Sequence, residues 1–301
     1  MDNFNKQRFL QVAKWDLTIN RSFYRSLSIV TLAGVVAISI FAFFIRWMVE
    51  DDVNPNETNR YTVAFTMLAI SYFTSFIMLV SAGCINHPLR NKQGRISALT
   101  IPATNSEKFL WHTLLMTVGC FIFCVLCIVA ADAIYTTLSI MVFPTDEIYS
   151  ISLQYVRSLF GSFPNIMDGD IMQDGAEDMQ CGGLLNINSV IFAGWMAHIL
   201  SISVFAFGNA IKYKYNIILT ILFLFILQFV FSILFFTSVI LFGDKIGDFF
   251  DAYISPAGLP TILNGIFIVG GIICLVISAV LWYYSYRLYC KAQVTSNMNK
   301  N

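Results

Sequence analysis

The sequence predicts an all-α integral membrane protein with six transmembrane helices and both termini in the cytoplasm. Three observations predict this fold class. Of the 301 residues, 57% are hydrophobic and only 12% are charged, and the mean hydropathy is +0.70, whereas a soluble domain carries about 25% charged residues. Six stretches contain the roughly 20 apolar residues that a helix needs to cross a bilayer. Lysine and arginine are concentrated in alternate connecting segments, which is the pattern that sets orientation.

The six apolar stretches are separated by polar connections, which give each one clear bounds. The third is longer than one crossing requires, so either it tilts or its first turns stand in the cytoplasm. The predicted spans are Leu27–Met48, Tyr61–Ile85, Phe109–Met141, Ser189–Ile211, Tyr215–Phe242 and Ile262–Tyr284.

The charges assign the two sides of the membrane. The segments before span one, between spans two and three, between spans four and five, and after span six hold 14 of the 18 lysines and arginines. Fourteen of the 18 acidic residues lie on the opposite side. By the positive-inside rule, the first group faces the cytoplasm. We therefore predict a cytoplasmic amphipathic segment 1–26, a six-helix domain 27–284 with an outer loop 144–188, and a cytoplasmic tail 285–301.

The segment before the first span mixes bulky apolar and basic side chains. Leu10, Ala13, Leu17 and Tyr24 fall near one face of a helix, and five lysines and arginines add positive charge. Such a segment can lie on the inner leaflet, attracted by anionic membrane lipid. The alternative is an ordinary charged tail.

The connection between spans two and three, "RNKQGRISALTIPATNSEKF", is the most specified loop in the chain. Its first half can form a short helix, with Ile96 and Leu99 on one face and Arg90, Lys92 and Arg95 around them. A rigid polar projection of this kind suggests docking to a soluble partner.

The second half of this loop predicts a bend and a new helix. Pro102 blocks helix continuation and favours an extended residue before it. Thr104 and Glu107 have the spacing of a capping box, in which each side chain accepts a hydrogen bond from the backbone of the other. The loop therefore reads as helix, bend and capped helix.

Motifs for chemistry are absent from the sequence. There is no G-x-x-x-x-G-K-[ST] for ATP, no H-E-x-x-H for zinc and no G-x-S-x-G nucleophile. Cys120, Cys124 and Cys127 share a helix face, and we interpret them as packing residues rather than a metal site. We expect no enzymatic activity, no catalytic or metal site, no bound cofactor and no nucleic-acid partner.

Two charged residues fall at similar depth in the outer halves of the spans. Arg46 lies near the outer end of span one, and Asp132 lies in the outer part of span three. Pairing would lower the cost of both charges in the membrane. Alternatively, each side chain reaches the outer interface separately.

The loop between spans two and three resembles the corresponding turn of type 2 ABC exporter permeases. That turn has a charged "R-x-x-G" element, a short helix ending in leucines, then "L-P-[AVT]-[ST]" and an acidic residue opening span three. Here Gly94, Leu99, Pro102 and Glu107 take those places, while Ile101 stands where leucine is commoner. The segment "FGNAIKYKYNIILT" is similar to the four-to-five turn of a bacterial branch of the family.

The resemblance implies a permease subunit in the bacterial cytoplasmic (inner) membrane. Residues 90–100 would form the coupling helix that contacts a separate cytoplasmic ABC ATPase. ATP and Mg would then bind to that partner and not to this chain, and a second permease copy or paralogue would complete the transporter. The competing interpretation is a non-transporting membrane sensor or immunity-type protein whose acidic outer loop binds a partner.

Overall fold

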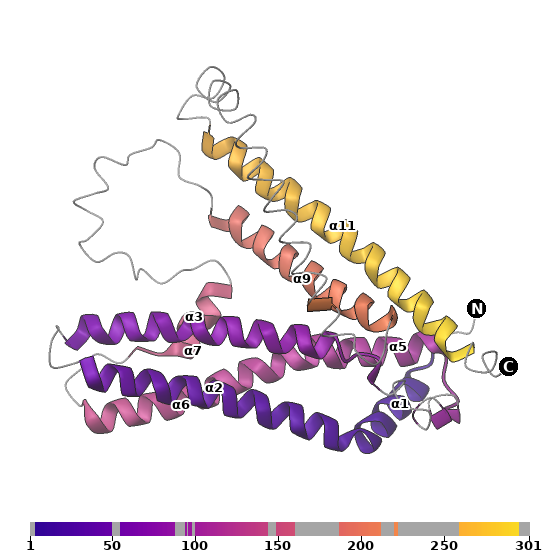
Figure 1. Ribbon diagram of the computed structural model, residues 1–301, viewed down its shortest axis with the longest axis horizontal. Coiled ribbons are helices and arrows are strands. Elements are labelled where there is room, and N and C mark those ends of the chain that lie inside the picture. The colour runs from indigo at the N-terminus through magenta and orange to yellow at the C-terminus, as the bar shows by residue number, and fades with distance from the viewer. Residues whose placement is uncertain are drawn as a thin grey trace. The chain divides into compact units, whose positions relative to one another are not determined.

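The computed structural model describes residues 4–49, 55–87, 94, 96–97, 100–143, 149–159, 187–211, 220–221 and 259–294, and all the regular elements within these ranges are helical. The chain divides into two compact units, Met1–Met172 and Gln173–Asn301. The helices of the first unit, labelled as in Figure 1, are α1 Lys6–Ile19, α2 Arg21–Val49, α3 Pro55–Ala82, α5 Asn105–Leu114, η2 Leu115–Gly119, α6 Cys120–Val142 and α7 Ile151–Leu159. Those of the second are α9 Ile187–Ile211 and α11 Leu259–Val294.

Five of the described helical stretches are long and apolar enough to cross a membrane. They are Arg21–Met48, Tyr61–Ala82, Asn105–Val142, Ser189–Ile211 and Asn264–Lys291. Five of the six predicted spans are thereby matched by such helices. The remaining prediction, Tyr215–Phe242, lies outside the described residues except for the two helical positions 220–221. The chain is thus a multi-pass membrane protein by the length and composition of its helices.

The third spanning stretch is longer than one crossing requires, as the sequence predicts, and it begins four residues before the predicted Phe109. Its α5, η2 and α6 segments run without interruption for 38 residues. At about 1.5 Å rise per residue this is about 57 Å, nearly twice the roughly 30 Å of a bilayer's hydrocarbon core. The polar first turn of α5 can therefore lie outside the hydrocarbon core, while the rest of the same helix crosses it.

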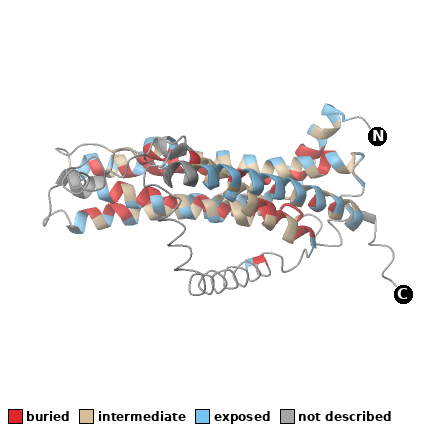
Figure 2. Ribbon diagram, turned by 90° about the horizontal axis from the view of Figure 1, so that it is seen from above, coloured by how far each residue is buried: buried red, intermediate tan, exposed pale blue. Residues whose placement is uncertain are grey.

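In the first unit, α2 packs against both α3 and α6, and α7 covers α3 and α6. The core between them includes Val35, Val63, Ile70 and Ala131, each fully buried. Gly34 allows a close approach, because a Cβ there would collide with the Phe73 ring of α3. The three cysteines Cys120, Cys124 and Cys127 are buried in the same packing, toward α2 and α3. Figure 2 shows the resulting pattern along the helices, with buried residues on one face and exposed residues on another.

In the second unit, α9 and α11 pack side by side over much of their length. Small residues line the contact: a Cβ on Gly271 would come within 2.6 Å of the Phe192 ring. The hydroxyls of Ser203 and Ser278 are hydrogen-bonded across it, and Ser285 donates to the Ala206 carbonyl at 3.4 Å. Small and hydroxyl-bearing residues allow helices to approach closely in a membrane.

The N-terminal segment forms a regular helix. Asn5 is the N-cap of α1, and its side-chain oxygen accepts hydrogen bonds from the backbone N–H groups of Gln7 and Arg8 at 2.9 and 3.4 Å. The predicted apolar face divides in the structure: Ala13 is buried, while Leu10 and Leu17 are exposed. Val12 is buried together with Ala13, and the Phe9 ring contacts Trp111, because α1 packs against α5 on this side and leaves Leu10 and Leu17 exposed.

Candidate functional site

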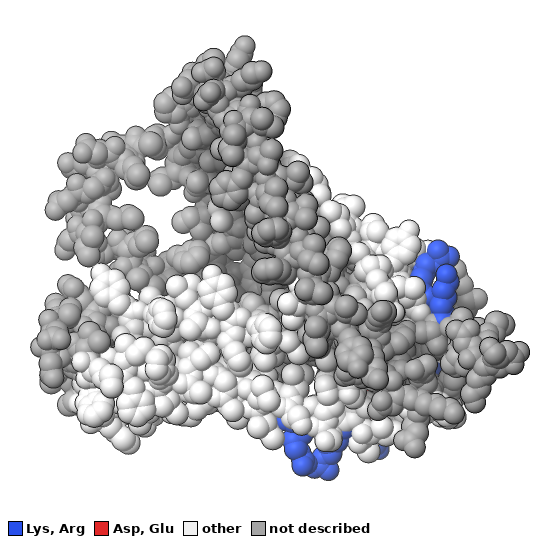
Figure 3. Space-filling model, in the orientation of Figure 1, with Lys and Arg blue, Asp and Glu red and all other residues white. Residues whose placement is uncertain are grey.

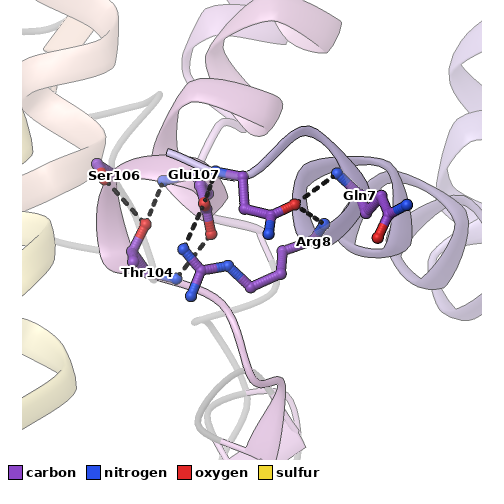
Figure 4. A network of polar contacts seen from close by, with 6 residues as sticks. Gln7, Arg8, Thr104, Ser106 and Glu107 are labelled. Carbon is purple, nitrogen blue, oxygen red and sulfur yellow. Dashed lines mark hydrogen bonds and ion pairs between the residues drawn. The ribbon is translucent and has the colours of Figure 1, made fainter. Parts of the chain in front are cut away.

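The predicted capping box is present at the start of α5. The Glu107 backbone N–H donates to the Thr104 hydroxyl at 3.3 Å, and the Thr104 N–H donates to the Glu107 carboxylate at 3.0 Å. Figure 4 shows these two residues with Ser106, whose hydroxyl lies 3.0 Å from that of Thr104. The sequence signature therefore predicted both reciprocal bonds correctly.

The Glu107 carboxylate also holds the N-terminal helix. Its Oε1 atom accepts hydrogen bonds from the Asn5 backbone N–H at 2.9 Å and from the Arg8 guanidinium at 3.1 Å. Glu107 is completely buried, whereas the Arg8 side chain is 36% exposed. One carboxylate thus caps α5, receives the start of α1 and forms an ion pair with it.

A second buried carboxylate, Asp16, fastens the other end of α1. It accepts hydrogen bonds from the Trp111 indole N–H at 2.9 Å, the Tyr24 hydroxyl at 2.5 Å and the Asn20 amide at 2.6 Å. His112 Nδ1 lies 3.6 Å away. These donors come from α5, from the first turn of α2 and from the bend between α1 and α2. We call Glu107 and Asp16 together the carboxylate clamp.

Two aromatic contacts join the same helices as the carboxylate clamp or their neighbours. The Phe9 ring meets the Trp111 ring edge-on, with centroids 5.9 Å apart. Phe23 of α2 stacks on His87, just after α3, with centroids 4.2 Å apart. Edge-on and offset arrangements of this kind are favourable beyond the area they bury. The ends of α1, α2, α3 and α5 are consequently joined in one polar and aromatic cluster.

The bend before α5 agrees with the prediction from Pro102. Residues 101–103 form a bend, and positions 94, 96, 97 and 100 before it are helical. Ile96 is 53% exposed. A cavity of about 240 Å³ separates the bend from α1 and is lined by Arg8, Gln11, Trp15, Thr100, Ile101 and Pro102. The predicted coupling residues Arg90, Lys92, Arg95 and Leu99 lie outside the described residues.

Asp132 has a well-defined place in the middle of α6. Its carboxylate accepts hydrogen bonds from the Ile151 backbone N–H at 2.8 Å and from the Ser150 and Ser152 hydroxyls at 2.6 Å each. It therefore caps α7, where the positive end of the helix dipole favours a carboxylate. The Arg46 guanidinium lies over the Phe143 ring, 4.4 Å from its centroid. The direct pairing of Arg46 with Asp132 stays a prediction.

A π-helical turn at Leu115–Gly119 lies within the long third spanning stretch, between α5 and α6. The Ser81 hydroxyl of α3 donates to the Met116 carbonyl within it at 2.7 Å. Such insertions break the regular i→i−4 bonding and need other donors for the carbonyls they displace. Nothing in the local sequence marks this turn.

No family model matches the sequence, and neither a curated protein nor a solved structure is similar to the chain at a significant level. The site residues therefore have to be interpreted from their own geometry. Sequence reasoning did not gather Asn5, Arg8, Asp16, Tyr24 and Trp111 into one site. One signal was available: from Lys6 to Arg25, Asp16 is the one acid among five lysines and arginines.

Proposed function

We propose that the chain is the membrane-spanning permease subunit of an ABC exporter in the bacterial cytoplasmic membrane. It would use ATP hydrolysed, with Mg, on a separate ATPase subunit, and a second permease copy or paralogue would complete the translocation path. The observation that supports this most is the rigid connection from the bend at residues 101–103 into the 38-residue helix Asn105–Val142.

Rigidity matters because a partner that moves can transmit displacement only through a stiff element. The capping box fixes the direction of α5 at its first turn, and the carboxylate clamp ties that turn to α1 and α2. A push on the helical positions 94, 96, 97 and 100 would therefore reach the spans instead of being lost in a flexible loop. Exposed Ile96 supplies apolar surface for the ATPase to contact.

The first test is the composition of the native complex. Affinity purification of the tagged chain from membranes in mild detergent is expected to recover a cassette ATPase in stoichiometric amount. A native complex that contains no ATPase would reject the exporter proposal. The sensor alternative instead predicts function without an ATPase and loss of function when the outer loop 144–188 is removed; most of this loop lies outside the described residues.

The second test separates coupling from folding. Ile96→Ser is expected to lower stimulation of the partner's ATPase activity at least tenfold, while membrane insertion and thermal stability stay as in the parent. Ile19→Ser is the matched control, since the Ile19 side chain is 56% exposed and that of Ile96 is 53% exposed. Gly94→Pro, which interrupts the helical turn at position 94, should act like Ile96→Ser. Equal stimulation in all variants would refute a coupling role for this segment.

A further inference from the structure

A cavity of about 270 Å³ lies in the first unit where the bend between α1 and α2 approaches α3 and the π-helical turn. Its wall is mainly apolar, with Leu17, Leu27, Leu115 and Phe123 around it. Gly119 of the π-helical turn also lines it, and a Cβ added there would lie 3.3 Å from the movable end of Leu115 and 3.7 Å, an ordinary contact distance, from the Leu114 carbonyl oxygen. The cavity therefore has room for apolar material.

Three of the four hydroxyls in the wall already donate hydrogen bonds within the protein, and the fourth, that of Ser28, lies on the face of α2 that carries Arg21 and Arg25. Tyr24 donates to Asp16 at 2.5 Å, Thr31 to the Leu27 carbonyl at 2.9 Å, and Ser81 to the Met116 carbonyl at 2.7 Å. Since these donors are already used within the protein, the interior of the cavity is chemically suited to hydrocarbon. Pockets for whole drug-sized ligands hold roughly 300–1,000 Å³, so this one suits a single chain.

Basic side chains flank the cavity. Arg21, Arg25 and Ser28 are spaced i, i+4 and i+7, and so share one face of α2; Ser28 lines the cavity. Both arginines are exposed, as is Lys14 on α1. Figure 3 shows blue basic side chains at the lower edge of the molecule, where Figure 1 places the bend between α1 and α2, with white surface beside them.

The one neighbouring acid, Asp16, offsets only part of the charge of Lys14, Arg21 and Arg25, so the net charge here stays positive. Asp16 is fully buried and is engaged by the Trp111, Tyr24 and Asn20 donors. The two arginines stand at the start of the spanning stretch Arg21–Met48, which is the level of lipid headgroups.

The apolar side chains of Leu114 and Val118, on the helix that contributes Leu115 and Gly119, are exposed and face outward.

We propose that this cavity binds one acyl chain of an anionic phospholipid, whose phosphate is held by Arg21 and Arg25. The charge selects the headgroup, and the apolar wall holds the chain. The occupied site would fill the junction of α1, α2, α3 and the π-helical turn, and so would stabilise the bend. This inference does not depend on the exporter proposal, because it needs only the bilayer as partner.

The first test is native mass spectrometry of the full chain in detergent, titrated with phosphatidylglycerol and with phosphatidylcholine of the same acyl chains. We expect one tightly bound phosphatidylglycerol and weaker phosphatidylcholine binding. The double variant Arg21→Gln, Arg25→Gln should lower phosphatidylglycerol affinity about 30-fold, on about 1 kcal/mol for each basic residue near the lipid surface. The double lysine variant keeps the charge and should retain most of the binding.

The second test addresses the cavity. Gly119→Leu should fill it and weaken binding of both lipids, whereas Lys6→Gln, at the other end of α1, should change neither. A phosphatidylglycerol with a photoreactive acyl chain should crosslink to peptides that contain residues 27–31 or 115–123. Equal affinity for the two lipids in the parent chain, or unchanged binding and crosslinking in Gly119→Leu, would overturn the proposal. Circular dichroism confirms that each variant is folded.

Discussion

Replacing Glu107 with glutamine tests whether one buried carboxylate joins α1 to the start of α5. The two oxygens of Glu107 accept hydrogen bonds from the Asn5 N–H, the Arg8 guanidinium and the Thr104 N–H. A glutamine of the same shape keeps one oxygen and places an NH₂ group where the other was. One backbone N–H must then face another donor, and because the same side chain holds Thr104 and Asn5, loss at either contact loosens the junction of α1 with α5.

The size of the effect follows from these contacts. A buried donor left without its acceptor costs about 1–3 kcal/mol. The ion pair adds less than about 1 kcal/mol, because solvent screens the 36% exposed Arg8 side chain. A loss of about 2 kcal/mol raises the population of states with α1 detached about 30-fold.

Hydrogen–deuterium exchange of the full chain in detergent measures this loss locally. The amides of α1 are expected to exchange about 30-fold faster in Glu107→Gln, while those of α7 stay unchanged. Asp132→Asn is the matched control, since it removes a buried carboxylate that caps α7 instead. It should accelerate exchange in α7 alone. Parent-like protection of α1 in Glu107→Gln would refute the role assigned to this side chain.

Two other predictions concern Asp16 of the carboxylate clamp and the contact between α9 and α11. Asp16→Asn should destabilise the bend between α1 and α2 by about 1–3 kcal/mol, because at least one of the Trp111, Tyr24 and Asn20 donors loses its acceptor; thermal unfolding in detergent measures it, and an unchanged midpoint would contradict the clamp at that end. Gly271→Leu should separate α9 from α11 and lower the unfolding temperature, because Phe192 occupies the space the new side chain needs. Gly265→Leu, on the same helix but with nothing within 4 Å of an added Cβ, is its control; equal effects of the two would contradict close packing at Gly271.

Local patterns explain why part of the site was predictable. Thr104 and Glu107 are three residues apart, so the capping box depends on one helical turn and on little else. The bend at Pro102 follows equally from a local restriction on the backbone. Glu107 also holds Asn5 and Arg8, which lie 102 and 99 positions before it in the sequence. No spacing rule connects them, because only the packing of α1 beside α5 brings them together.

The sequence by itself determined the class of this protein, since a chain this apolar must place its long hydrophobic stretches in helices whose backbone groups are satisfied internally. It also determined where five of those helices lie and how α5 begins. Only the tertiary structure decided what the buried charges do. Asp16 binds Trp111 and Asp132 caps α7, because a carboxylate removed from water must find donors wherever the packed helices present them.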